Sequence, residues 1–335
     1  MACNSSILKD QINLKRSSSH VYTISYHADW TVGPVLHGGC VAAAIHHTAT
    51  THLVSEPTLA ARNQPDLLTL HLEFLQACEP RDSTITVSEL KVGARTSTLQ
   101  LQLSQGGQIK VVALATSIDL DSPGPTAATA WRLHPPPRPK PDFEAVLAHK
   151  PDAHWLPAHL SGEIIPLTRR QLVLNPRDGF QVDGICDAWN AFQGDERMDA
   201  TYLALMTDLI PSMSDTLLRN GGLYDARRSF AQIEQWAEEH PGVPAELTNS
   251  LKEAMRTPIF NNTVTLDVEF KRKLPKEGVQ WTFTRAESRM LEGGRLDLDV
   301  TICDQNMDLL CMARQTILVL DARRKFKGGK AKGVL

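Results

Sequence analysis

The chain has 335 residues, of which 42% are hydrophobic and 22% are charged, and its formal net charge is −3 at pH 7. This length exceeds what one hydrophobic core usually serves, so we expect two domains. The near-neutral charge argues against a nucleic-acid partner. No apolar run reaches the roughly eighteen residues of a membrane span. We therefore expect the protein to bind neither nucleic acid nor a membrane.

The cysteines and the N-terminus indicate the compartment. Six cysteines are scattered along the chain without a CxxC pair: Cys3, Cys40, Cys78, Cys186, Cys303 and Cys311. This spacing favours free thiols in a reducing compartment over a disulfide framework. The first twenty residues lack the apolar core of a signal peptide. We therefore expect a cytoplasmic protein.

The first elements in chain order are a strand over 21–32 and a helix from His37 to about Val54. The helix begins with Gly38 and Gly39, and each glycine inside a helix costs about 1 kcal/mol relative to alanine. Something at this point must therefore need a bare backbone. Alternating runs rich in Thr, Val, Ile and Leu then predict four strands, over 67–76, 82–93, 96–105 and 108–120.

A proline-rich stretch interrupts the chain after the fourth of these strands. Residues 122–143 contain seven prolines and no helical or strand period, which is typical of a linker. Beyond it the pattern predicts two strands, an apolar helix over 198–213 that stops near Pro211, and four more strands. The predicted strands are 169–176, 185–193, 262–275, 279–291, 295–305 and 307–321.

The two halves repeat one order of elements, a strand and a helix followed by four strands. The match extends to single residues, because TLHLEF at 69–74 corresponds to TLDVEF at 265–270. This order predicts an α+β fold made of two units, each an antiparallel sheet wrapped around a central helix. We divide the chain into a unit over 15–121, a linker over 122–160, a unit over 161–322 and a basic tail over 323–335.

This layout resembles the hotdog fold, and the two-unit chain resembles the fungal and bacterial double-hotdog thioesterases akin to acyl-CoA thioesterase II. The resemblance implies hydrolysis of acyl thioesters carried by coenzyme A or an acyl carrier. In similar single-unit enzymes a carboxylate follows the histidine of His-Gly-Gly by nine residues. Here that position is His46, whereas Asp199 matches His37 in the second unit and is followed nine residues later by Asp208. The first unit thus keeps the glycines and the second keeps the carboxylate.

The resemblance also implies which residues act. In the acyl-CoA thioesterase II group an Asp, a Thr and a Gln hold the attacking water, and these positions correspond to Asp208, Thr265 and Gln315. The strand after Thr265 is one residue shorter than in that group. The corresponding residues of the first unit are His46, Thr69 and Ala115. We expect the main chain at His37, Gly38 and Gly39 to bind the substrate carbonyl, because a helix N-terminus offers unpaired N–H groups.

Several alternatives remain open from the sequence. Asp208 could instead cap a neighbouring helix or pair with Arg314. A hotdog chain could also be a dehydratase, isomerase or cyclase of a secondary-metabolite pathway that uses His37 or His46, or an acyl-binding protein that has lost its activity. The Lys271–Lys273 cluster could meet the phosphates of coenzyme A or end a solvated strand. Because one chain already contains two units, it could be a monomer or could form a homo-oligomer.

A metal site is not expected in the histidine-rich helix. His46 and His47 are adjacent and point about 100° apart on a helix, and neither they nor His52 have a carboxylate at ligand spacing. We therefore expect no metal and no cofactor.

Overall fold

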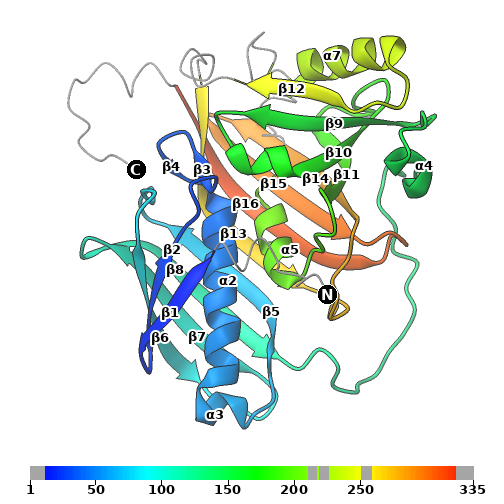
Figure 1. The fold of residues 1–335 in the computed structure, drawn as a ribbon. Helices are drawn as coiled ribbons and strands as arrows, with labels where there is room; N and C mark the ends of the chain where they lie inside the picture. The colour runs from blue at the N-terminus through cyan, green and yellow to red at the C-terminus, as the bar shows by residue number, and fades with distance from the viewer. Residues whose placement is uncertain (1–11, 210–216, 219–225, 250–258, 322–335) are drawn as a thin grey trace, which may run out of the picture.

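The computed structural model describes residues 12–209, 217–218, 226–249 and 259–321. These residues form one 14-stranded sheet and a separate two-stranded hairpin, with two helices against the inner side of the large sheet (Figure 1). The basic tail predicted over 323–335 lies outside the described residues.

The N-terminal half supplies the first half of the sheet and the longer central helix. Its elements are β1 (Asn13–Ser18), β2 (Val21–Ser25), β3 (Thr31–Val32), β4 (Val35–Leu36), α2 (Gly38–Ser55), α3 (Pro57–Ala60), β5 (Asp66–Phe74), β6 (Ser83–Lys91), β7 (Ser97–Gln105) and β8 (Gln108–Ile118).

The C-terminal half repeats this order with additions. Its elements are α4 (Phe143–Leu147), β9 (Trp155–Gly162), η1 (Pro166–Arg170), β10 (Gln171–Pro176), β11 (Ile185–Phe192), α5 (Ala200–Met206), α7 (Ala226–Glu239), β12 (Ala245–Asn249), β13 (Ile259–Phe270), β14 (Thr282–Glu292), β15 (Arg295–Cys303) and β16 (Leu309–Asp321). The sequence did not predict β1, β4, α3, α4, β9, η1, α7 or β12, and α4 and the start of β9 fall within the expected linker.

The helix α2 is apolar on nearly all sides because it fills the centre of its unit. Residues 40–45 are all fully or almost fully buried, as expected for a helix without a polar face. The sheet around it shows the complementary pattern, because alternate residues of β7 are buried and half-buried. A run of three alanines, 42–44, lets the strands approach the helix closely.

The two units join edge to edge, so the two wrapped sheets expected from the sequence form one continuous sheet. The strand order is β1-β2-β6-β7-β8-β5-β13-β16-β15-β14-β11-β10-β9-β12. β5 and β13 pair antiparallel, with His71 opposite Asp267. Joining the edges removes the open sheet edge that a lone unit would expose. One pairing at the far end, β9 with β12, is parallel.

The sheet carries an internal two-fold axis between His71 and Asp267. Thr69 pairs with Glu269 and Glu73 pairs with Thr265, so the two strands exchange equivalent positions. Both units also break register at the same place, between Leu67 and Thr69 in β5 and at the matching position of β13. The repeat inferred from the sequence is therefore a geometric repeat.

The second central helix is shorter than predicted. α5 ends at Met206 with Thr207 as its C-cap, whereas the sequence pattern predicted a helix over 198–213. Residues 210–213 of that prediction lie outside the described residues.

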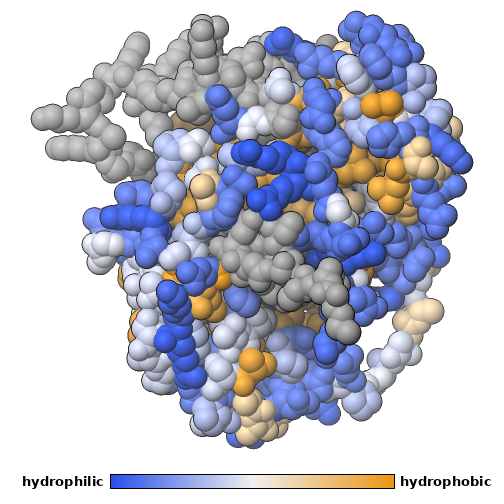
Figure 2. Space-filling model, viewed as in Figure 1, coloured by the Kyte–Doolittle hydropathy of each residue, from blue (hydrophilic) through white to orange (hydrophobic). Residues whose placement is uncertain are grey.

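None of the helices in the described ranges is both long and apolar enough to cross a membrane. Figure 2 shows that hydrophilic residues cover most of the described surface on the viewed face, interrupted by separate hydrophobic areas.

Candidate active site

The N-terminus of α2 is closed by the residue before its two glycines. His37 is the N-cap, with extended backbone, and its Nδ1 accepts a hydrogen bond from the Gly39 N–H at 3.2 Å. Its own N–H donates to the Trp30 carbonyl at 2.9 Å. A ring nitrogen that accepts a hydrogen bond carries no proton, so Nε2 is the nitrogen left to donate. The histidine of the His-Gly-Gly pattern is thus explained by helix capping.

Asp208 lies against the same helix N-terminus, although it comes from the other unit. Its Oδ2 accepts the Gly39 N–H at 2.7 Å and lies 3.7 Å from His37 Nδ1. The side chain is 16% exposed. Asp208 follows α5 directly and is therefore at the unfavourable end of its own helix dipole, but the positive end of α2 compensates. Asp208 thus does contact the end of a neighbouring helix, as one alternative from the sequence anticipated, whereas Arg314 pairs with Asp299.

The two glycines are required by this approach of α5 to α2. A Cβ at Gly38 would lie 2.8 Å from Asp208 Oδ2. A Cβ at Gly39 would lie 2.6 Å from the Leu205 carbonyl oxygen and 3.1 Å from the Asp208 Cβ. Any larger residue would therefore push the end of α5 away from the start of α2.

Gln315 joins this group from β16. It is fully buried, and its Nε2 donates to the carbonyl of Thr207, the residue before Asp208, at 2.7 Å. Its Oε1 accepts from the Thr263 hydroxyl at 3.2 Å. The amide therefore ties the strand pair β13–β16 to the backbone that carries the carboxylate.

Thr263 is the threonine that contacts Gln315, whereas Thr265, the residue implied by the resemblance, has a different environment. Thr265 pairs with Thr316 and Glu73 across the sheet, on the face that also carries Asp267. Gln315 pairs with Leu266, which faces the core. The register break between Thr263 and Thr265 turns Thr263 to the inner face, because an extra residue in a strand re-aims its neighbours.

The pseudo-symmetric counterpart of this site, at the N-terminus of α5, lacks an equivalent of the Asp208–Gln315 pair. His46, the counterpart of Asp208, has its Nδ1 3.1 Å from the hydroxyl of Thr201, the counterpart of Gly39. Its ring packs 5.2 Å from that of Phe270. Asp199 caps α5 by accepting from the N–H groups of Thr201 and Tyr202. The counterpart of Gln315 is Ala115, so no carboxylate and amide meet there.

Thiol chemistry does not suit this site. Cys40 follows Gly39, and burial, with the nearby Asp208 charge, raises the pKa of its thiol well above the usual value. Burial also raises the pKa of Cys78 to about 12, and that of Cys186, Cys303 and Cys311 in the same direction. These five cysteines, which are all those in the described ranges, are free, and they remain protonated near pH 7.

The basic cluster that directly follows β13 is engaged by nearby carboxylates. Lys271 pairs with Glu269, Arg272 with Asp308 and Lys273 with Asp121. The arrangement matches a solvated strand end.

The chain matches two protein-family models and one curated relative along nearly its whole length. The family model described as the acyl-CoA thioesterase N-terminal domain matches residues 26–118, and the model of the corresponding C-terminal domain matches residues 134–319. The thioesterase-like protein TwmA of Talaromyces wortmannii is 25% identical over 353 residues, covering 99% of this chain and 97% of that protein.

Solved structures agree in fold. A conserved protein with a hot dog fold from Alicyclobacillus acidocaldarius matches with a TM-score of 0.64 and 18% identity, covering 94% of this chain and 98% of that one. The acyl-CoA thioesterase II TesB2 of Mycobacterium marinum matches with a TM-score of 0.57 and 18% identity, over 94% and 97% of the two chains. The hotdog fold predicted from the repeat is confirmed.

Proposed function

This chain belongs to the acyl-CoA thioesterase family and is a thioester hydrolase, and we propose that it hydrolyses acyl-CoA with a water held by Asp208, Gln315 and Thr263. The observation that carries the proposal is the contact of Asp208 with the α2 N-terminus, with Gln315 bound to the adjacent Thr207 carbonyl. The three groups come from three places in the fold: the Asp208 carboxylate from the segment after α5, the Gln315 amide from β16, and the Thr263 hydroxyl from β13.

The hydrogen-bonding capacity of each group suits this role. Asp208 Oδ2 accepts a hydrogen bond from the Gly39 N–H. The second carboxylate oxygen accepts a hydrogen bond from the water. The Gln315 amide nitrogen gives one hydrogen to the Thr207 carbonyl and has a second to donate. The Thr263 oxygen accepts while its hydrogen is donated to Gln315. Together these groups orient one water.

In the proposed reaction the water oxygen bonds to the thioester carbonyl carbon while one of its protons passes to Asp208. The carbonyl oxygen becomes negative and is stabilised by main-chain N–H groups at the start of α2. Gly39 already serves Asp208, so we assign this role to Gly38, the first helical residue, whose N–H has no intrahelical partner. The C–S bond then breaks, and Asp208 returns the proton to the leaving sulfur.

The first test measures free thiol released from a panel of short- and long-chain acyl-CoAs. We expect Asp208→Asn to lower kcat by about 10²-fold or more, because Asn cannot accept the proton. Gln315→Ala should cause a smaller loss, since it removes orientation but not the base. Thermal unfolding of each variant controls for folding. Full activity of Asp208→Asn would remove Asp208 from the mechanism.

The paired variants Thr263→Val and Thr265→Val decide which threonine acts. Loss of one hydrogen bond to an oriented water should lower kcat about 10-fold in Thr263→Val. Thr265→Val, a matched change on the opposite face of the same strand, should keep its activity. The reverse outcome would restore the position implied by the family resemblance.

A further inference from the structure

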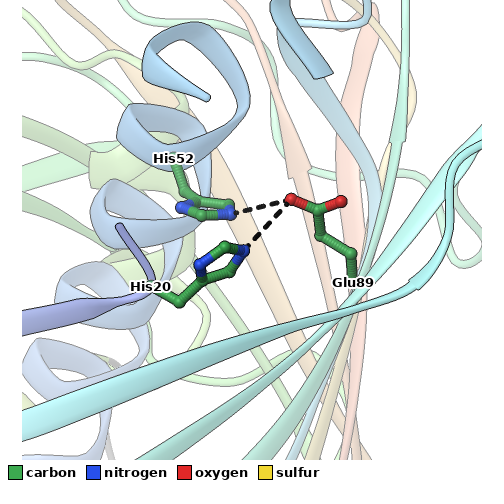
Figure 3. Close-up of side chains that lie close together, drawn as sticks. All are labelled: His20, His52 and Glu89. Atoms are coloured by element: carbon green, nitrogen blue, oxygen red, sulfur yellow. Dashed lines mark ion pairs between the residues drawn. The ribbon is translucent and has the colours of Figure 1, made fainter. Parts of the chain in front are cut away.

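Three potential metal ligands meet at the other end of α2, far from the proposed active site. His52 lies in the last turn of the helix, His20 in the turn between β1 and β2, and Glu89 on β6 (Figure 3). One ligand atom of each lies within 4.8 Å of the others. The two Nε2 atoms are 3.4 Å (His20) and 3.6 Å (His52) from the same Glu89 oxygen.

Both imidazoles are oriented by hydroxyl groups. His52 Nδ1 lies 3.0 Å from the Tyr22 hydroxyl, and His20 Nδ1 lies 2.9 Å from the Ser19 hydroxyl. These bonds turn both Nε2 atoms toward Glu89. Metal-bound histidines usually use their second ring nitrogen in this way, which fixes the ring and its tautomer.

The His52 Nε2 atom lacks a partner of its own. His52 is fully buried, and among the described residues no hydrogen-bond partner lies within reach of this nitrogen. The Glu89 oxygen at 3.6 Å is too distant for a good hydrogen bond. A cation between the three side chains would satisfy the buried lone pair.

We propose that His20, His52 and Glu89 form a binding site for one divalent transition-metal ion, for which Zn²⁺ is the best match. Two imidazoles and one carboxylate are a common zinc ligand set, with water in the fourth position. Tetrahedral bonds of about 2.0–2.1 Å place ligand atoms about 3.3 Å apart, close to the two distances to Glu89. His20 and Glu89 are partly exposed, which gives the ion access from solvent.

The proposed metal site lies apart from the proposed active site. His37 and His52 are fifteen residues apart on α2, or about 22 Å at 1.5 Å per residue. The ion would tie the end of α2 to the β1–β2 turn and to β6. From the sequence, we weighed His52 as a metal ligand only together with His46 and His47 of the same helix. Its proposed partners, His20 and Glu89, come from distant segments of the chain.

The test titrates Zn²⁺ into the chelator-treated full-length protein by calorimetry, and records the visible spectrum with Co²⁺ in its place. We expect one Zn²⁺ per chain, a higher unfolding temperature with the ion, and the bands of a four-coordinate Co²⁺ site. Glu89→Gln and His20→Ala change partly exposed residues and should fold, and each should weaken binding by about 100-fold or more.

His71→Ala is the matched control. His71 is an exposed histidine beside two carboxylates, Asp267 and Glu73, so its loss should leave Zn²⁺ binding unchanged. Absence of binding by the wild type would overturn the proposal. So would binding that persists in Glu89→Gln and His20→Ala, or a Co²⁺ spectrum with thiolate bands that disappear in Cys3→Ser.

Discussion

The two glycines at the start of α2 matter for the contact between the two units rather than for the helix itself. Their missing side chains leave the space that the end of α5 and the Asp208 carboxylate occupy. The Gly39 N–H then both caps against His37 and holds Asp208. The energetic cost of two glycines in a helix is offset by a contact between units that a larger residue would prevent.

The variant Gly38→Ala tests whether the position of Asp208 depends on the space left by this glycine. The added methyl would lie 2.8 Å from Asp208 Oδ2, so the carboxylate must move. We expect kcat for acyl-CoA hydrolysis to fall at least about 10-fold, with a loss of stability of about 1–3 kcal/mol from overpacking. Gly124→Ala is the control, because nothing lies within 4 Å of its added methyl. Unchanged kinetics of Gly38→Ala would show that the carboxylate does not depend on this space.

The linker becomes part of the C-terminal unit well before its expected end. The Phe143 ring of α4 stacks on Trp281 at 4.8 Å and meets Trp189 edge-on, within a cluster that also includes Trp155 and Phe283. The Trp155 indole donates to the Pro139 carbonyl at 2.7 Å. This segment covers the strand face opposite the central helix, so β11 and β14 are buried along much of their length on both faces.

A buried ion pair anchors the same segment. Arg285 on β14 is fully buried, donates to both oxygens of Asp187 on β11 at 2.7 Å, and donates to the Pro135 carbonyl at 2.6 Å. One side chain thus joins two strands and the linker.

Arg285→Met should lower the free energy of unfolding by about 3 kcal/mol, because it leaves the Asp187 carboxylate largely buried without its partner. Chemical denaturation measures the loss. Arg272→Met removes a similar two-point pair with Asp308 that is about half exposed, and should cost less than about 1 kcal/mol. Equal losses in the two variants would contradict the assigned role of burial.

The whole molecule is a pseudo-symmetric pair whose chemistry is asymmetric. Each central helix presents the residue nine positions after its cap to the start of the other, as Asp208 to Gly39 and as His46 to Thr201. Only the first of these contacts has an acid. The units therefore depend on each other, since the carboxylate comes from one and the helix N-terminus that holds it from the other.

Cutting the connection between the units should therefore leave the assembly intact. A specific protease site inserted between Gly124 and Pro125 lies in an exposed stretch without helix or strand. The β5–β13 pairing and the α2–α5 contact remain after cleavage. We expect the two pieces to elute together in size-exclusion chromatography and to retain most of the thiol-releasing activity. Separation of the pieces with full activity in one of them would refute the shared site.

The sequence determined the repeated order of elements, the helix at His-Gly-Gly and most strand positions, because alternation and turn residues are local signals. The division of motifs between the halves pointed to Asp208, and the family resemblance implied Gln315; both stay predictions as catalytic residues. The sequence did not show that β5 and β13 are the strands that join the halves, since this pairing brings together segments almost 200 residues apart.

The tertiary structure alone decided which threonine accompanies Gln315. The alternation in TLDVEF places Thr265 with Asp267 and Glu269 on the outer face, but it gives no sign of the bulge that turns Thr263 inward. The structure likewise brought His20 and Glu89 to His52. A register shift and a meeting of three distant segments depend on how strands pair across the molecule, and no local pattern of residue types encodes either one.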